Sequence, residues 1–111
     1  MSLRQKQSKF AEMAAKLILK AIELGFEVTL GDAYRDARVF GAMGERKGYG
    51  ESRSAHNQRL ALNINLGKAG RYSATHEGHQ QLGEWWESQG GAWGGRFDDP
   101  NHYSLEHGGI K

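Results

Sequence analysis

The chain begins with apolar residues at helical spacing. Between Ser8 and Leu24, apolar side chains recur at steps of three and four, as on one face of an α-helix. These residues are Phe10, Met13, Ala14, Leu17, Ile18 and Ala21. Gly25 follows where a left-handed residue commonly ends a helix. The pattern therefore predicts an amphipathic helix over 8–24.

Two later segments alternate apolar and polar residues, which is typical of β-strands. The first covers 26–30, and Gly31 follows it as a stop. In the second, over 60–66, leucine and isoleucine alternate with Ala61, Asn63 and Asn65, so one strand face is apolar and the other small and polar. A turn is expected over 67–70, where Gly67 and Gly70 flank Lys-Ala.

The remaining segments give weaker patterns. Residues 31–55 are rich in glycine and charge, which predicts a long loop with a helical stretch over 36–43. Such loops in compact domains are usually functional. Helical spacing predicts a second helix over 75–89, capped by Thr75. Two short strands, over 93–97 and 102–106, are expected around the Asp-Asp-Pro-Asn turn.

This order of elements predicts an α+β fold with a small, mainly antiparallel sheet and two or three helices. The length of 111 residues fits a single domain over 1–111.

Composition and charge narrow the chemistry. The chain has no cysteine, which excludes disulfides, thiol nucleophiles and cysteine-ligated zinc. The first twenty residues carry a net charge of +4, whereas the rest is slightly acidic. This basic segment is either a solvated face or a surface that favours an anionic partner such as a bacterial cell wall. A duplex-binding protein would show a denser basic patch, so nucleic acid is not expected.

We find no secretory signal and no apolar stretch that could span a membrane. We therefore expect a protein that is made in the cytoplasm and is not inserted in a membrane. A monomer is also expected, because no apolar surface stripe is evident in the sequence.

Five histidines without cysteine suggest a metal site, and three residues could form it. If Asn63 and His102 lie on neighbouring strands, their side chains could converge with His56, and three ligands with one open position are typical of catalytic zinc. Asp99 would be the nearby general base. The alternative is a polar sheet surface that faces solvent. His76, His79 and His107 are expected to be surface or packing residues.

Three motifs resemble one enzyme family. Ser54-Ala55-His56 with the strand after it resembles the S-x-H-x(6)-D segment of the D-alanyl-D-alanine carboxypeptidase family, and especially the phage L-alanyl-D-glutamate endopeptidases. The stretch 90–103 resembles that family's G-G-x-W-G-G…D-x-x-H-F/Y segment, and 31–35 its G-E-x-Y-R element. The match covers nearly the whole chain, in order.

The resemblance implies a zinc peptidase with the fold of the hedgehog and D-Ala-D-Ala peptidases. It implies that His56 and His102 bind one Zn²⁺. It also implies that Asp99 is the catalytic carboxylate and that Arg35 engages substrate oxygens. Ser54 and Trp93 would border the substrate. The substrate would be the stem peptide of peptidoglycan, reached after release from the cytoplasm or from a virion.

The sequence departs from the family at Asn63, where the family has its aspartate ligand. A neutral amide is a poorer zinc donor than a carboxylate, so we expect weakened metal binding first and weakened catalysis second. The chain is then an active variant, a relative that only binds peptidoglycan or serves as a phage structural module, or an inactivated form. Asp36, Glu51 or Glu106 could replace the missing ligand, although Glu106 lies too far along its strand. Which stem-peptide bond is cut, and whether the metal is zinc, manganese or nickel, remain open.

Overall fold

The computed structural model describes residues 1–34, 54–73 and 77–111. Its helices are α1 (Leu3–Glu23) and α3 (Gly78–Ser88), with the short 3₁₀ helices η1 (Ala55–Gln58) and η2 (Gly94–Phe97). Its strands are β1 (Glu27–Leu30), β2 (Ala61–Lys68), β3 (Arg71–Ser73), β4 (Ala92–Trp93) and β5 (His102–Ser104). This is the predicted α+β fold.

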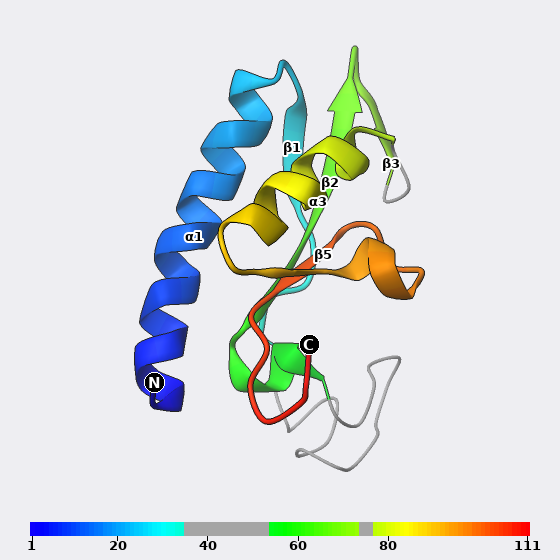
Figure 1. Ribbon diagram of the computed structural model, residues 1–111. Coiled ribbons are helices and arrows are strands. Elements are labelled where there is room, and N and C mark those ends of the chain that lie inside the picture. Colours follow the sequence, from blue (N-terminus) through cyan, green and yellow to red (C-terminus); the bar gives the residue numbers. More distant parts are fainter. Residues whose placement is uncertain (35–53, 74–76) are drawn as a thin grey trace.

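β2 is the central strand of the sheet. The strand order is β1-β2-β5-β4, with β3 also paired to β2, and every pairing is antiparallel. β1 pairs with the second half of β2, whereas β5 pairs with its first half, over Ala61–Asn63. Both α-helices lie on one side of this sheet (Figure 1).

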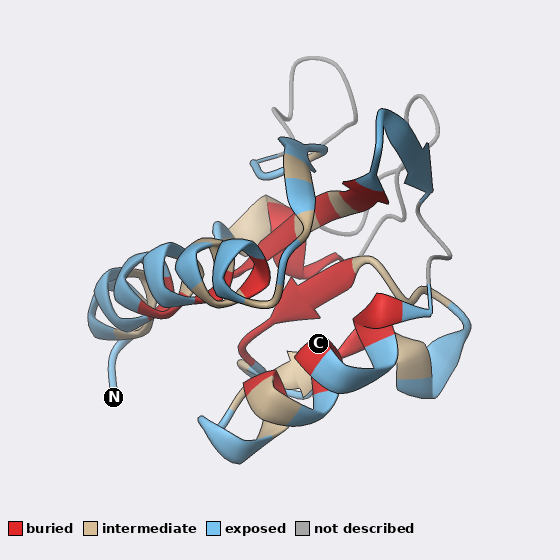
Figure 2. Ribbon diagram, turned by 90° about the horizontal axis from the view of Figure 1, so that it is seen from above, coloured by how far each residue is buried: buried red, intermediate tan, exposed pale blue. Residues whose placement is uncertain are grey.

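The core lies between the sheet and the two helices, where the buried residues gather in Figure 2. Leu62, Ile64 and Leu66 of β2 face it, and the last two are fully buried. Trp86 of α3 connects the layers, because it packs edge-on against two other rings. Its ring centroid lies 5.9 Å from that of Phe10 on α1 and 5.8 Å from that of Tyr103 on β5. The alternation that predicted β2 thus correctly separates the three apolar residues from Asn63 and Asn65, which are half-buried. Ala61, which was expected on the polar face, is instead buried in the core cluster.

A buried polar pair sits within this core. The Tyr103 hydroxyl lies 2.6 Å from His79 Nδ1, and both side chains are almost fully buried. Burial raises the pKa of Tyr103 far above its usual value, so the phenol stays neutral. Of the two roles expected for His79, surface residue or packing residue, the structure shows the packing role.

α1 begins five residues before its predicted start, because Ser2 and Gln5 form a capping box. The Ser2 hydroxyl accepts from Gln5 N–H at 3.2 Å, and the Gln5 side chain accepts from Ser2 N–H at 2.9 Å. At the other end Gly25 adopts φ +92°, the left-handed conformation that its position predicts.

The predicted strand over 93–97 is wrong beyond Trp93. The chain instead curls into η2, and Asp99 N–H donates to Gly94 O at 2.8 Å. Alternation also misses β3, which is exposed along its length and pairs only with the end of β2. α3 begins at Gly78, and the expected cap Thr75 lies outside the described residues. The expected helical stretch over 36–43 also lies outside them.

Candidate metal centre

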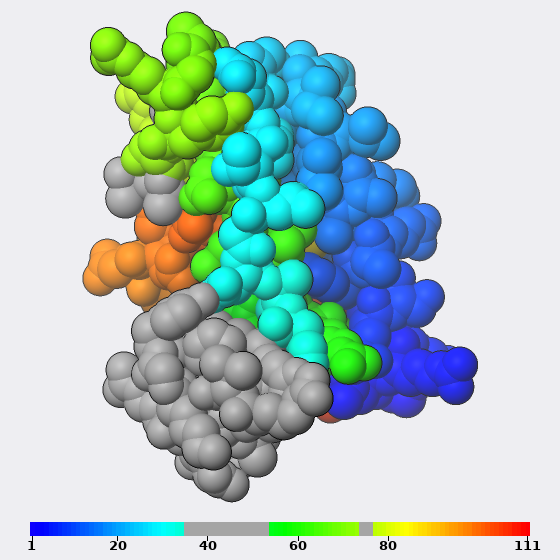
Figure 3. Space-filling model, turned by 180° about the vertical axis from the view of Figure 1, so that it is seen from behind, coloured from blue at the N-terminus to red at the C-terminus, as the bar shows by residue number. Residues whose placement is uncertain are grey.

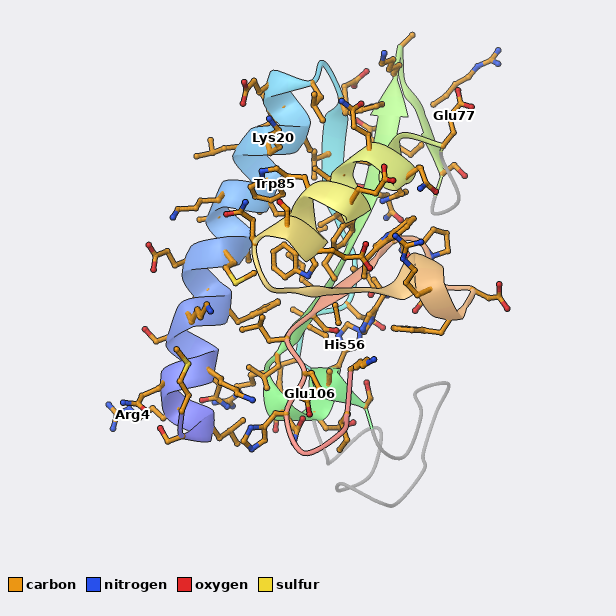
Figure 4. The ribbon with its side chains drawn as sticks, viewed as in Figure 1. Arg4, Lys20, His56, Glu77, Trp85 and Glu106 are labelled. Atoms are coloured by element: carbon orange, nitrogen blue, oxygen red, sulfur yellow. The ribbon has the colours of Figure 1, made fainter. Side chains whose placement is uncertain are left out.

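η1 positions His56. Ser54 is the N-cap of this short helix, and its buried hydroxyl accepts from His56 N–H at 3.1 Å. The His56 side chain is only 1% exposed and lies inside the molecule, beside η1 (Figure 4). Ser54, predicted to contact substrate, therefore has a structural role, and its contact with substrate stays a prediction.

A backbone carbonyl fixes the His56 ring. Its Nδ1 lies 2.6 Å from Ala33 O, and a carbonyl can only accept, so Nδ1 carries the proton. In the neutral ring Nε2 then holds the lone pair, which is the form in which imidazole binds a metal. Metal-binding histidines usually donate their second ring N–H in this way.

Asn63 and His102 are opposite each other on β2 and β5. The neighbouring bonds, Leu105 N–H to Leu60 O and Ile64 N–H to Asn101 O, make this a non-hydrogen-bonded pair. In such pairs the Cα atoms are about 4.5 Å apart and the side chains are closest. The sequence analysis required these two residues to lie side by side on adjacent strands if they share a site. The structure meets this condition.

The third side chain joins them from η1. The ring centroids of His56 and His102 lie 5.1 Å apart, with planes at 74°. Asn63 Oδ1 is buried and accepts no hydrogen bond from any described residue, although buried amide oxygens normally have a donor. Two imidazoles and this oxygen are nitrogen and oxygen donors that one zinc ion can accept, and the neutral amide is the weakest of the three. Within the described ranges, no three His, Asp or Glu side chains are grouped to hold a metal.

Asp99 lies at the edge of this group. Its Oδ2 is 3.8 Å from His102 Nδ1, and its side chain is 47% exposed. His102 N–H donates to Asp99 O at 3.0 Å, which closes the turn between η2 and β5. The carboxylate is thus beside a candidate ligand and within reach of water.

Glycine is required where η2 meets this turn. A Cβ on Gly94 would lie 2.1 Å from Asp99 O and 2.6 Å from His102 Cβ. A Cβ on Gly95 would overlap the Trp93 ring at 2.3 Å. These close approaches explain two glycines of the motif around Trp93 as packing requirements of the site.

Trp93 is buried, with 5% of its surface exposed, and its indole N–H donates to Pro100 O at 2.8 Å. The structure gives it a packing role, and a substrate contact stays a prediction. Phe97, which the sequence did not single out, is 45% exposed and its ring lies 5.4 Å from that of His102. Its only signal in the sequence is its place just before the Asp-Asp-Pro turn.

Several predicted residues are not brought into the site. Arg35, Asp36 and Glu51 lie outside the described residues. Glu106 lies beyond the end of β5, and its carboxylate accepts from Gly109 N–H at 2.6 Å. It is therefore not the replacement ligand.

We compared the sequence with protein-family models and with curated proteins. No protein-family model matches the chain, and no curated protein matches its sequence. In the part of the chain that the structure describes, no helix has the length and apolar character needed to cross a membrane.

Proposed function

We propose that the protein is a zinc peptidase that hydrolyses an amide bond in the stem peptide of bacterial peptidoglycan. The convergence of His56, Asn63 and His102 from three separate elements supports this proposal most directly. The half-exposed carboxylate beside them is the second supporting feature.

Each of these residues has a role in the proposed reaction. His56, through Nε2, would hold the metal together with His102 and the Asn63 amide oxygen. Zinc, when bound, would supply Lewis-acid polarisation of the scissile carbonyl. Asp99 accepts a proton from the attacking water and returns it to the leaving amine, a task that suits a carboxylate in contact with solvent. We assign Arg35 to the substrate oxygens, on the resemblance alone.

Zinc titration by calorimetry, with elemental analysis of the purified chain, tests the site. We expect one zinc per chain in the wild-type protein and none in His56→Ala. His107→Ala is the matched control, because His107 lies in the C-terminal turn, and it should bind zinc as the wild type does. No zinc in the wild-type chain, or equal loss in both variants, would overturn the assignment.

Asn63→Asp tests whether the amide at position 63 limits zinc affinity and hydrolysis. Restoring a carboxylate should strengthen zinc binding by at least about tenfold, because a charged oxygen replaces a neutral one. Digestion of purified peptidoglycan should rise in parallel, and mass spectrometry of the fragments would identify the cleaved bond.

A second candidate function is a non-catalytic cell-wall-binding or phage structural module on the same fold. The amide at position 63 is the observation that favours it. Tight binding of peptidoglycan by the wild-type chain, with no hydrolysis by Asn63→Asp at saturating zinc, would decide for this module.

A further inference from the structure

Arg59 has an unfavourable backbone conformation right after the helix that carries His56. Its φ of 59° and ψ of 35° are left-handed, a region that glycine adopts freely and a residue with a side chain adopts at a cost. Its N–H caps η1 by donating to Ala55 O and His56 O, which glycine would do equally well. The conformation alone therefore does not account for an arginine here, so its side-chain contacts become informative.

The Arg59 side chain stacks on Tyr34. The guanidinium carbon lies 4.3 Å from the centre of the Tyr34 ring, within the range of a cation–π contact. Both residues are exposed at the surface, Tyr34 by 46%. With the described residues, the guanidinium makes this cation–π contact and no ion pair or hydrogen bond.

Tyr34 belongs to a short segment, 31–34, that contacts the candidate ligands on β2 and η1. Gly31 N–H donates to Asn63 O at 2.8 Å, and Asn63 N–H donates to Asp32 O at 2.7 Å. Ala33 O, one residue further on, holds His56 Nδ1. The segment 31–34 follows the end of β1 and lies on the surface seen in Figure 3, in cyan.

We propose that Arg59 is a positioning residue. By stacking on Tyr34 it holds the segment 31–34 against η1, and it thereby keeps the Ala33 carbonyl on His56 and the His56 ring in one tautomer. Only the expected effect on zinc binding rests on the proposed function. The effect of Arg59 on the position of His56 can be tested in the metal-free protein.

Arg59→Gly separates this role from a general contribution to stability. Glycine relieves the left-handed conformation, so the melting temperature should be unchanged or higher by up to about 5 °C. The site should loosen even so. In ring ¹⁵N spectra of the metal-free protein, the single Nδ1–H tautomer of His56 should become a mixture. Hydrogen exchange of the Asn63 amide, which donates to Asp32 O, should accelerate at least about tenfold.

Variants at position 34 test the stacking contact. Tyr34→Phe keeps the ring face and should behave as the wild type, whereas Tyr34→Ala should reproduce the site changes of Arg59→Gly. Arg59→Lys keeps a cation and should restore part of the wild-type spectrum. An unchanged His56 tautomer and Asn63 exchange rate in both Arg59→Gly and Tyr34→Ala would overturn the proposal. So would equal damage from Tyr34→Phe and Tyr34→Ala.

Zinc titration gives a separate readout. If the wild-type chain binds zinc, Arg59→Gly should weaken binding about three- to tenfold, since loss of a group that orients a ligand typically weakens metal sites. If the wild-type chain does not bind zinc, the proposed function fails, while the tautomer and exchange measurements still decide the role of Arg59.

Discussion

At the scale of single residues, the candidate ligands depend on groups that hold them in place. Ser54 caps the helix that carries His56, and the Ala33 carbonyl sets the orientation of its ring. Neither group would touch the metal. Both nevertheless decide whether His56 Nε2 is directed to the position where His102 and Asn63 meet.

Ser54→Ala tests this dependence. Loss of the cap should lower the free energy of unfolding by about 1 kcal/mol, measured by urea denaturation. It should also weaken zinc binding, because the His56 N–H loses the acceptor that fixes η1. Ser2→Ala is the matched control, since it removes a similar cap from α1. We expect a comparable loss of stability there and no change in zinc affinity. Equal zinc affinity in both variants would contradict the positioning role of Ser54.

At the scale of elements, η2 and the turn after it place His102 opposite Asn63. Gly94→Ala should disturb this arrangement, because the new Cβ would overlap Asp99 O and His102 Cβ. We expect a loss of about 2–3 kcal/mol in unfolding free energy. Gly90→Ala is the comparison, since it adds a methyl group in open space at φ +93° and should cost only about 1 kcal/mol. Equal losses would mean that the Gly94 contact relaxes easily.

A second element-scale feature ties the β2–β3 hairpin to β1. The Glu27 carboxylate accepts from Gly70 N–H at 3.2 Å and from the Tyr72 hydroxyl at 3.0 Å. These bonds, the Gly70 bond most, lower the pKa of Glu27. A carboxyl whose pKa is lower in the folded state stabilises the fold above its unfolded pKa, about 4.3, and loses that contribution as the pH falls through the folded pKa.

Glu27→Gln should therefore lower the melting temperature at pH 7 and have no effect near pH 2, where the wild-type carboxyl is also neutral. Thermal unfolding of both proteins across this range measures the difference. Tyr72→Phe removes one of the two donors and should show a smaller deficit with the same pH dependence. A deficit for Glu27→Gln that persists unchanged at pH 2 would show that charge is not the cause.

The sequence predicts elements whose side chains alternate or recur regularly, and it misses those held by backbone contacts. Alternation over 60–66 is enough to place Asn63 on the polar face of β2. Ala33 contributes only a carbonyl, which no side-chain pattern reveals. The curl of 94–97 depends on how closely Gly94 approaches Asp99, a contact that forms only in the folded chain. β3 has no alternation because its residues are all exposed.

At the scale of the whole molecule, the candidate ligands connect parts that lie far apart in the chain. His56 comes from η1, Asn63 from the central strand and His102 from β5. The unfolded chain does not hold these three residues together, so zinc that binds the folded form stabilises it. At a free zinc concentration 100 times its Kd, the gain is about 2.7 kcal/mol. For a domain of this size, the melting temperature should rise by about 10 °C.

Thermal unfolding with and without zinc measures this gain, and two comparisons make the result specific to the site. Magnesium at the same concentration should not stabilise the protein, because it prefers all-oxygen coordination and two of the three donors here are imidazoles. His56→Ala should lose the zinc effect, since the remaining pair of donors on β2 and β5 is one neutral amide and one histidine. Equal stabilisation of His56→Ala and the wild type would place the bound zinc elsewhere and would remove the main support for a metal centre between η1 and the sheet.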